Sequence, residues 1–90
     1  MTAVVAIHAV GNMDTWLKGG ADRKDVFAKV CSSHRIFRHP DQANRVSIVC
    51  ENADLAKIKA AMDTAEIKAL MAKHTVIAPV DVYIEVDGGS

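Results

Sequence analysis

Histidines and two aromatic residues are the side chains of this sequence best suited to chemistry. Four histidines, one tryptophan and one tyrosine occur in 90 residues. His8 stands in the middle of an otherwise apolar segment, and a buried imidazole without partners for its nitrogens costs roughly 1–3 kcal/mol. His8 is therefore a candidate general base or ligand, with a hydrogen-bonded interface histidine as the alternative.

His74 and Tyr83 are the other candidates for acid–base catalysis. His74 ends the second helical pattern, where a cation is also favoured by the helix dipole. The Tyr83 phenol could donate a hydrogen bond to a ligand carbonyl or bond across a dimer. His74 could therefore serve only to stabilise the helix end, and Tyr83 could serve only as a dimer contact, with no part in catalysis.

Trp16 and His34 are candidate ligand contacts. The Trp16 indole could form a stacking wall for a flat ligand, or it could pack as a lid over a sheet. His34 ends the first helical region in the predicted pattern, and His39 is expected to be solvated in a turn.

Spacing motifs for metals or nucleophiles are not found in the sequence. No histidine pair has HxH or HxxxH spacing, and there is no GxSxG motif or phosphate-binding glycine loop. Cys31 and Cys50 are predicted to be buried, reduced, small apolar residues and not a disulfide. We expect no metal and no cofactor.

Composition narrows the class of protein and its partners. Eleven basic residues balance eleven acidic ones, which argues against binding to nucleic acid or to an anionic membrane. The apolar N-terminal run lacks a basic flank and is too short to span a bilayer. We expect a single domain over residues 1–90 in a cytoplasmic protein.

The first half of the chain predicts strand, helix and hairpin. Residues 4–10 form an apolar strand, and Asp14 begins a helical turn. A helical period returns over residues 22–34, with Arg23 and its charged neighbours mostly on the outer side. Residues 35–39 and 45–50 form the arms of a hairpin around a turn at 40–44.

The second half predicts a helix in two parts and a final strand. Asn52 or Asp54 begins the helix, and Asp63 with Glu66 forms a capping box that restarts it. Residues 75–80 are predicted as a loop. Apolar and polar residues then alternate over 80–86, the period of a strand with one wetter face, and 87–90 form a frayed tail.

The order βαββαβ predicts an α+β, ferredoxin-like domain with a four-stranded antiparallel sheet. Right-handed crossovers place the first and third strands in the middle and both helical regions on one face. The other face would carry either the odd or the even residues of 3–10, and both sets are apolar. We therefore expect a homodimer whose two sheets close into an α/β barrel.

These features together resemble a known superfamily. Its marks are Asp14-Thr-Trp16, the hairpin sequence RHPDQANRV at 38–46, Asp54-Leu55, and AEIKALMAKH at 65–74. They resemble the small dimeric α/β-barrel proteins, which include the antibiotic biosynthesis monooxygenase and stress-responsive barrel groups. The resemblance covers nearly the whole chain and rests on positions that shape the fold. Members have diverse activities, so fold alone does not name one.

The resemblance implies a pocket between the sheet and the helices. Asn12 and Trp16 match its ligand-contacting positions, whereas Gly19-Gly20 replaces bulkier helical residues. It implies binding of an apolar or aromatic small molecule, with cofactor-free monooxygenase-like or cyclase-like chemistry by His or Tyr. A non-catalytic dimeric binding module is the alternative. Some relatives hold haem through one histidine, a possibility that the residues leave open.

Overall fold

The structure is a computed structural model that describes residues 2–86. Residues 87–90, expected to form a frayed tail, lie outside this range. The strands are β1 (Thr2–Val10), β2 (Ser33–Arg38), β3 (Arg45–Ala53) and β4 (Val76–Ile84). The helices are α1 (Met13–Lys18), α2 (Gly20–Ala28), α3 (Leu55–Met62) and α4 (Ala65–Lys73).

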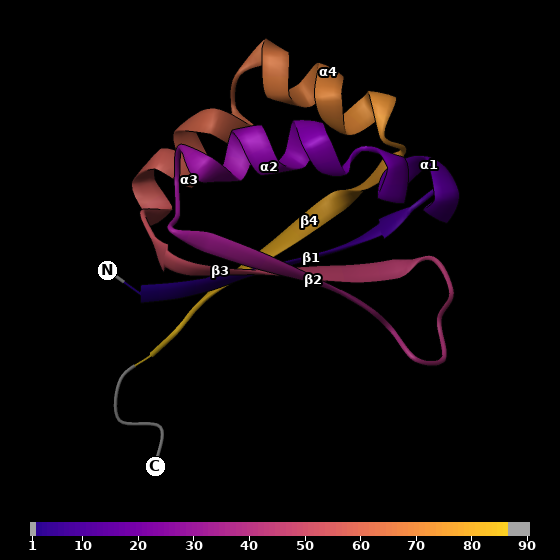
Figure 1. The fold of residues 1–90 in the computed structure, drawn as a ribbon, viewed down its shortest axis with the longest axis horizontal. Coiled ribbons are helices and arrows are strands. Elements are labelled where there is room, and N and C mark those ends of the chain that lie inside the picture. Colours follow the sequence, from indigo (N-terminus) through magenta and orange to yellow (C-terminus); the bar gives the residue numbers. More distant parts are fainter. Residues whose placement is uncertain (1, 87–90) are drawn as a thin grey trace.

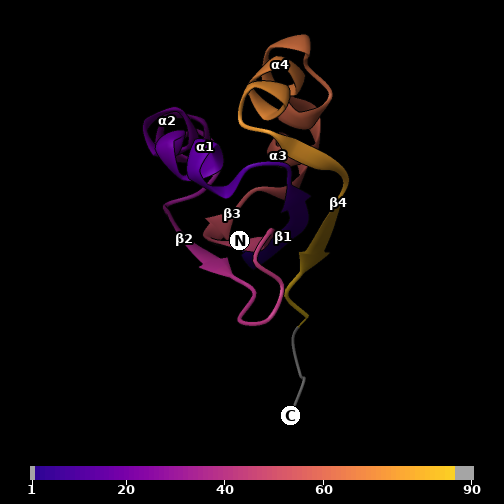
Figure 2. The same ribbon diagram turned by 90° about the vertical axis from the view of Figure 1, so that its right-hand side faces the viewer.

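One antiparallel sheet in the order β2-β3-β1-β4 carries all four helices on one face, as Figures 1 and 2 show. The expected α+β, ferredoxin-like arrangement is therefore confirmed, with β1 and β3 in the middle. Each predicted helical region consists of two short helices. No helix among residues 2–86 is a candidate to cross a bilayer; the longest, α2 and α4, have nine residues.

Polar side chains explain where three helices begin. The Oδ1 atom of Asn12 accepts a hydrogen bond from the Thr15 N–H at 2.9 Å, and Asp54 accepts one from the Lys57 N–H at 3.2 Å. Thr64 caps α4 in the same way. Such caps satisfy N–H groups that have no partner inside the helix. Caps had been predicted at Asp14 and Asp63, so each true cap lies one or two residues away.

The apolar residues of the sheet and helices meet in a single core. Val4 and Val10 of β1 face the helices. Strand β3 pairs with β1 and adds buried residues of its own on the same face of the sheet. The buried members are Val4, Val10, Trp16, Val46, Ile48, Cys50, Ala53 and Ile58. The odd-numbered residues of β1 therefore face away from the helices, which settles the two alternatives that the sequence left open.

Two predicted elements are wrong in part. The helical period over 22–34 continues past the end of α2 at Ala28, and His34 lies in β2 opposite Cys50. Pairing with β3 outweighs the local helical pattern there. Residues 76–80, predicted as a loop, belong to β4. Its register with β1 shifts between Ile7 and Ala9, and Pro79 is accommodated in this irregularity of an edge strand.

Candidate functional site

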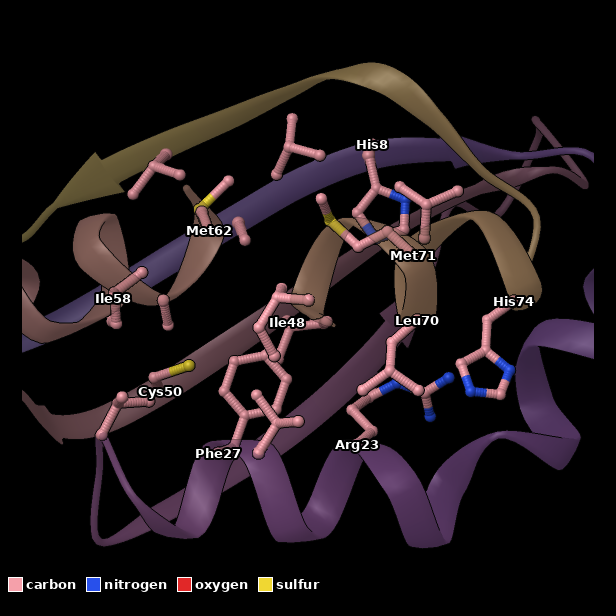
Figure 3. A pocket seen from close by; sticks show the side chains of 18 of the residues that line it. His8, Arg23, Phe27, Ile48, Cys50, Ile58, Met62, Leu70, Met71 and His74 are labelled. Carbon is pink, nitrogen blue, oxygen red and sulfur yellow. The ribbon is translucent and has the colours of Figure 1, made fainter. Parts of the chain in front are cut away.

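A cavity of about 130 Å³ lies between the sheet and helices α2, α3 and α4 (Figure 3). Strands β1, β3 and β4 form its floor, and three helices form its roof. Most of its walls are apolar. The apolar side chains that line it include Phe27, Ile48, Ile58, Met62, Leu70 and Met71.

His8 projects from β1 on the cavity floor (Figure 3). Its side chain is only 4% exposed, and its Nδ1 atom lies 2.9 Å from the Ala9 carbonyl oxygen. A carbonyl can only accept, so Nδ1 carries the hydrogen and Nε2 keeps a lone pair. Burial lowers the pKa of His8 more than the bond to Ala9 raises it, so the imidazole is neutral at pH 7.

Trp16 forms a wall behind His8 and does not line the cavity itself. Its indole is 2% exposed and meets the His8 ring edge-on, with ring centres 5.9 Å apart and planes at 73°. The guanidinium carbon of Arg23 lies 3.8 Å from the centre of the indole. Both polar groups therefore contact one indole and lie at the same end of the cavity.

Arg23, Asp22 and His74 line this end of the cavity from the helical side, and Figure 3 shows Arg23 and His74 there. The Nε2 atom of His74 lies 3.0 Å from Asp22 Oδ2 and connects the end of α4 to α2. This hydrogen bond, with the charge of Lys73, holds the pKa of Asp22 below its usual value. Arg23 donates to the Trp16 carbonyl oxygen, and burial lowers the pKa of its guanidinium.

Three of the six predicted site residues come together at this end. His8 and His74 line the cavity, and Trp16 packs behind His8. His8 and Trp16 are in contact, and His74 lines the same cavity from the end of α4.

The other three lie elsewhere. Asn12 is exposed and its side chain caps α1. His34 packs on Phe27 with ring centres 5.1 Å apart, beside the cavity lining and not within it. Tyr83 is 59% exposed and pairs with Val5, an outward-facing residue of β1, so it projects from the opposite sheet face to His8. Within one chain Tyr83 cannot act on a molecule in this cavity.

Arg23 and Asp22 were missed by sequence reasoning, which placed Arg23 on the outer side of its helix. A signal was available, because Arg23 precedes Phe27 by four residues and Val30 by seven. That spacing puts it on the buried face of α2. The charge of Arg23 obscured the pattern, since a long arginine side chain can bury its stem while its charged end reaches a polar site.

The size of the cavity, the absence of a metal-ligand cluster among residues 2–86 and the state of the thiols limit the other kinds of chemistry considered for this site. The pocket volume of about 130 Å³ is close to the roughly 150 Å³ of an apolar cavity that holds one benzene molecule. No three metal-ligating side chains converge within residues 2–86. Cys31 and Cys50 are unpaired thiols, and burial raises the pKa of Cys50 to about 12, which makes it a poor nucleophile at pH 7.

No protein-family model matches this sequence, and no curated protein is significantly similar to it. Solved structures do match its fold. An antibiotic biosynthesis monooxygenase-like protein from Bordetella bronchiseptica has 14% identity and a TM-score of 0.69, with 97% of this chain and 98% of that chain covered. A similarly described protein from Caulobacter crescentus has 17% identity and a TM-score of 0.67, covering 92% and 85%.

A third match is SnoaB, a cofactor-independent oxygenase from Streptomyces nogalater. It is 13% identical with a TM-score of 0.66, and the match covers 99% of this chain and 93% of SnoaB. These similarities over whole chains establish that the protein has the ferredoxin-like fold of the antibiotic biosynthesis monooxygenase-like proteins. At such low identity they establish the fold alone.

Proposed function

We propose that this protein binds a small aromatic molecule in the cavity and removes a proton from it, with His8 as the general base. The observation that carries the proposal is the state of His8. A neutral imidazole projects from the floor of an apolar cavity, and its Nδ1–H is fixed by the Ala9 carbonyl. A base of this kind needs a free lone pair and a pKa near or below the working pH.

The chemistry favoured is deprotonation of a hydroxyl on the ring, with the proton passing to Nε2 of His8. The electron-rich anion that remains is the species that would react with molecular oxygen in a cofactor-free oxygenation, or that would cyclise. SnoaB, which shares the fold, is described as a cofactor-independent oxygenase, and this supports the proposal by analogy. His74 would hold the roof of the site through Asp22 and would not itself exchange the proton.

A non-catalytic binding module is the second candidate. The observation favouring it is that His8 already has a backbone partner and an edge contact with Trp16. Those contacts can account for a buried histidine without any reaction. The two candidates share the cavity and differ only in turnover.

We also propose that a second copy of the chain covers the helix-free face of the sheet. This face carries the outward residues of β1 with exposed Phe37, Ile77 and Tyr83. Apolar sheet faces of this kind are usually covered by a partner. Light scattering at micromolar concentration should give the mass of a dimer, and the mass of a monomer would disprove the proposal.

Binding and turnover can be measured separately. Monocyclic hydroxylated aromatics should change the fluorescence of Trp16, the single tryptophan, and at least one should be converted. His8→Gln should retain binding but lose at least 100-fold in turnover. Binding without any conversion would favour the module, and no binding would remove both candidates.

A further inference from the structure

We propose that the ligand of this cavity is a single aromatic ring bearing a carboxylate, and that Arg23 is the residue that recognises the carboxylate. This rests on the proposed function, because it assigns a ligand class to the same cavity. It goes beyond that function by requiring a negative charge and by limiting the ring system to one ring.

The first argument is that Arg23 has no acidic partner. No carboxylate of residues 2–86 lies within ion-pair distance of its guanidinium. Its contacts are the face of the Trp16 indole and the Trp16 carbonyl oxygen. A guanidinium has five N–H donors, so several remain for a ligand. A partly buried cation without a counter-charge is costly, and a bound carboxylate would supply that counter-charge through two parallel hydrogen bonds.

The neighbouring carboxylate does not compensate Arg23. Asp22 is adjacent in the sequence, but its Oδ2 atom is engaged by His74 Nε2 at 3.0 Å and by Lys73 Nζ at 3.5 Å. The charge of Asp22 is thus matched by groups at the end of α4. Arg23 is left as the unmatched positive charge at the polar end of the cavity, which favours an anionic ligand group there.

The second argument is the size of the cavity. Its volume of about 130 Å³ is close to the roughly 150 Å³ of an engineered cavity that binds benzene. One ring matches this space, and because the pocket is partly open to solvent the carboxylate can lie at its polar end outside the apolar part. Beyond the polar end the walls are apolar, with Ile58 and Met62 of α3 on the left of Figure 3 and Arg23 on the right, so the ring would extend toward α3.

The third argument concerns the position of the hydroxyl. His8 and Arg23 both contact the indole of Trp16. Both side chains therefore lie near one aromatic group, and the ring position adjacent to the carboxylate is the one we choose to test for a hydroxyl that reaches His8. This makes 2-hydroxybenzoate the appropriate probe, with its hydroxyl next to the carboxylate.

Calorimetry with three probes tests the inference. The probes are 2-hydroxybenzoate, the neutral 2-hydroxybenzamide, and 3-hydroxy-2-naphthoate with a second fused ring. Wild type should bind the benzoate at least about tenfold more tightly than either of the others. Arg23→Met should remove the preference for acid over amide, and Arg23→Lys should retain part of it. Lys24→Met, which removes an exposed charge from the same helix, should leave the preference intact.

The binding results distinguish a failure of carboxylate recognition by Arg23 from a failure of the proposed aromatic binding. Equal binding of benzoate and benzamide by wild type, or a preference that survives in Arg23→Met, would overturn carboxylate recognition while leaving aromatic binding in place. Tight binding of the naphthoate would overturn the single-ring limit. If none of the probes nor any other small aromatic bound, the proposed function itself would fail. Thermal unfolding of each variant establishes that a lost preference is not lost folding.

Discussion

Gly19 lies directly against the imidazole of His74. A Cβ atom placed at Gly19 would come within 2.5 Å of His74 Nδ1 and 2.9 Å of its Cγ. The absence of a side chain at Gly19 is therefore what lets His74 approach α2 and reach Asp22. The pair Gly19-Gly20, unusual from the sequence, thus has one member with a definite packing role.

Gly19→Ala should destabilise the protein by about 1–3 kcal/mol, the usual cost of overpacking. The added methyl group would displace the His74 ring and break its hydrogen bond to Asp22. Gly20→Ala is the matched control, because a Cβ there meets nothing within 4 Å and alanine is favoured in a helix. Urea unfolding measures both, and equal effects of the two substitutions would contradict the packing role of Gly19.

The burial of His8 predicts a pH dependence of stability. The unfolded chain takes up a proton at His8 near pH 6.5, whereas the folded protein does so only at lower pH because burial lowers the pKa of His8. Between these values the unfolded state binds more protons, so the free energy of unfolding falls as the pH is lowered below about 6.5. His8→Gln should show a smaller fall than wild type. Parallel curves for wild type and His8→Gln would show that His8 is not buried as described.

The contact between Asp22 and His74 predicts a loss of stability in the same direction as for His8, but at a lower pH. The hydrogen bond from His74 lowers the pKa of Asp22. Its contribution to stability is therefore present above the ordinary aspartate pKa of about 3.9 and is lost as the pH falls through the lowered value. Carbon NMR of the carboxyl group should show a lowered midpoint in wild type that rises in His74→Leu. An unchanged midpoint in that variant would assign the shift to something other than His74.

Substitutions of Asn12 test whether its side chain stabilises the fold or contacts a ligand. Asn12→Ala should cost about 1 kcal/mol of stability through the lost helix cap, while Asn12→Asp should retain most of it. Affinity for the aromatic probes should stay within a factor of two in both variants, because the side chain bonds to Thr15 and does not line the cavity. Loss of affinity without loss of stability would restore the ligand contact predicted from the sequence.

Tyr83 tests the proposed dimer independently of the cavity. Its side chain is exposed on the helix-free face of the sheet. Tyr83→Lys would place a charge in the proposed interface and should lower the association constant at least tenfold in analytical ultracentrifugation. Aromatic binding per chain should persist, since the cavity lies on the other face. An unchanged association constant would argue against this face as the contact.

Local patterns in the sequence were sufficient for the order of the elements. The alternation near Val82, the turn at 40–44 and the cap at Asp54 each act over a few residues, so they can be read without the rest of the chain. Handedness of the crossovers then placed β1 and β3 in the middle of the sheet. Where tertiary pairing opposed a local pattern, as at His34 in β2, the prediction was wrong.

The composition of the site was decided only by the tertiary structure. Strand β1 is apolar on both faces, so the sequence alone could not show that His8 faces the helices and that Tyr83, one strand away, faces the other side. Nor could it show that Arg23 turns inward, because its burial depends on the Trp16 indole contributed by α1. The sequence determines local elements through neighbouring residues, whereas a site depends on how distant elements pack against one another.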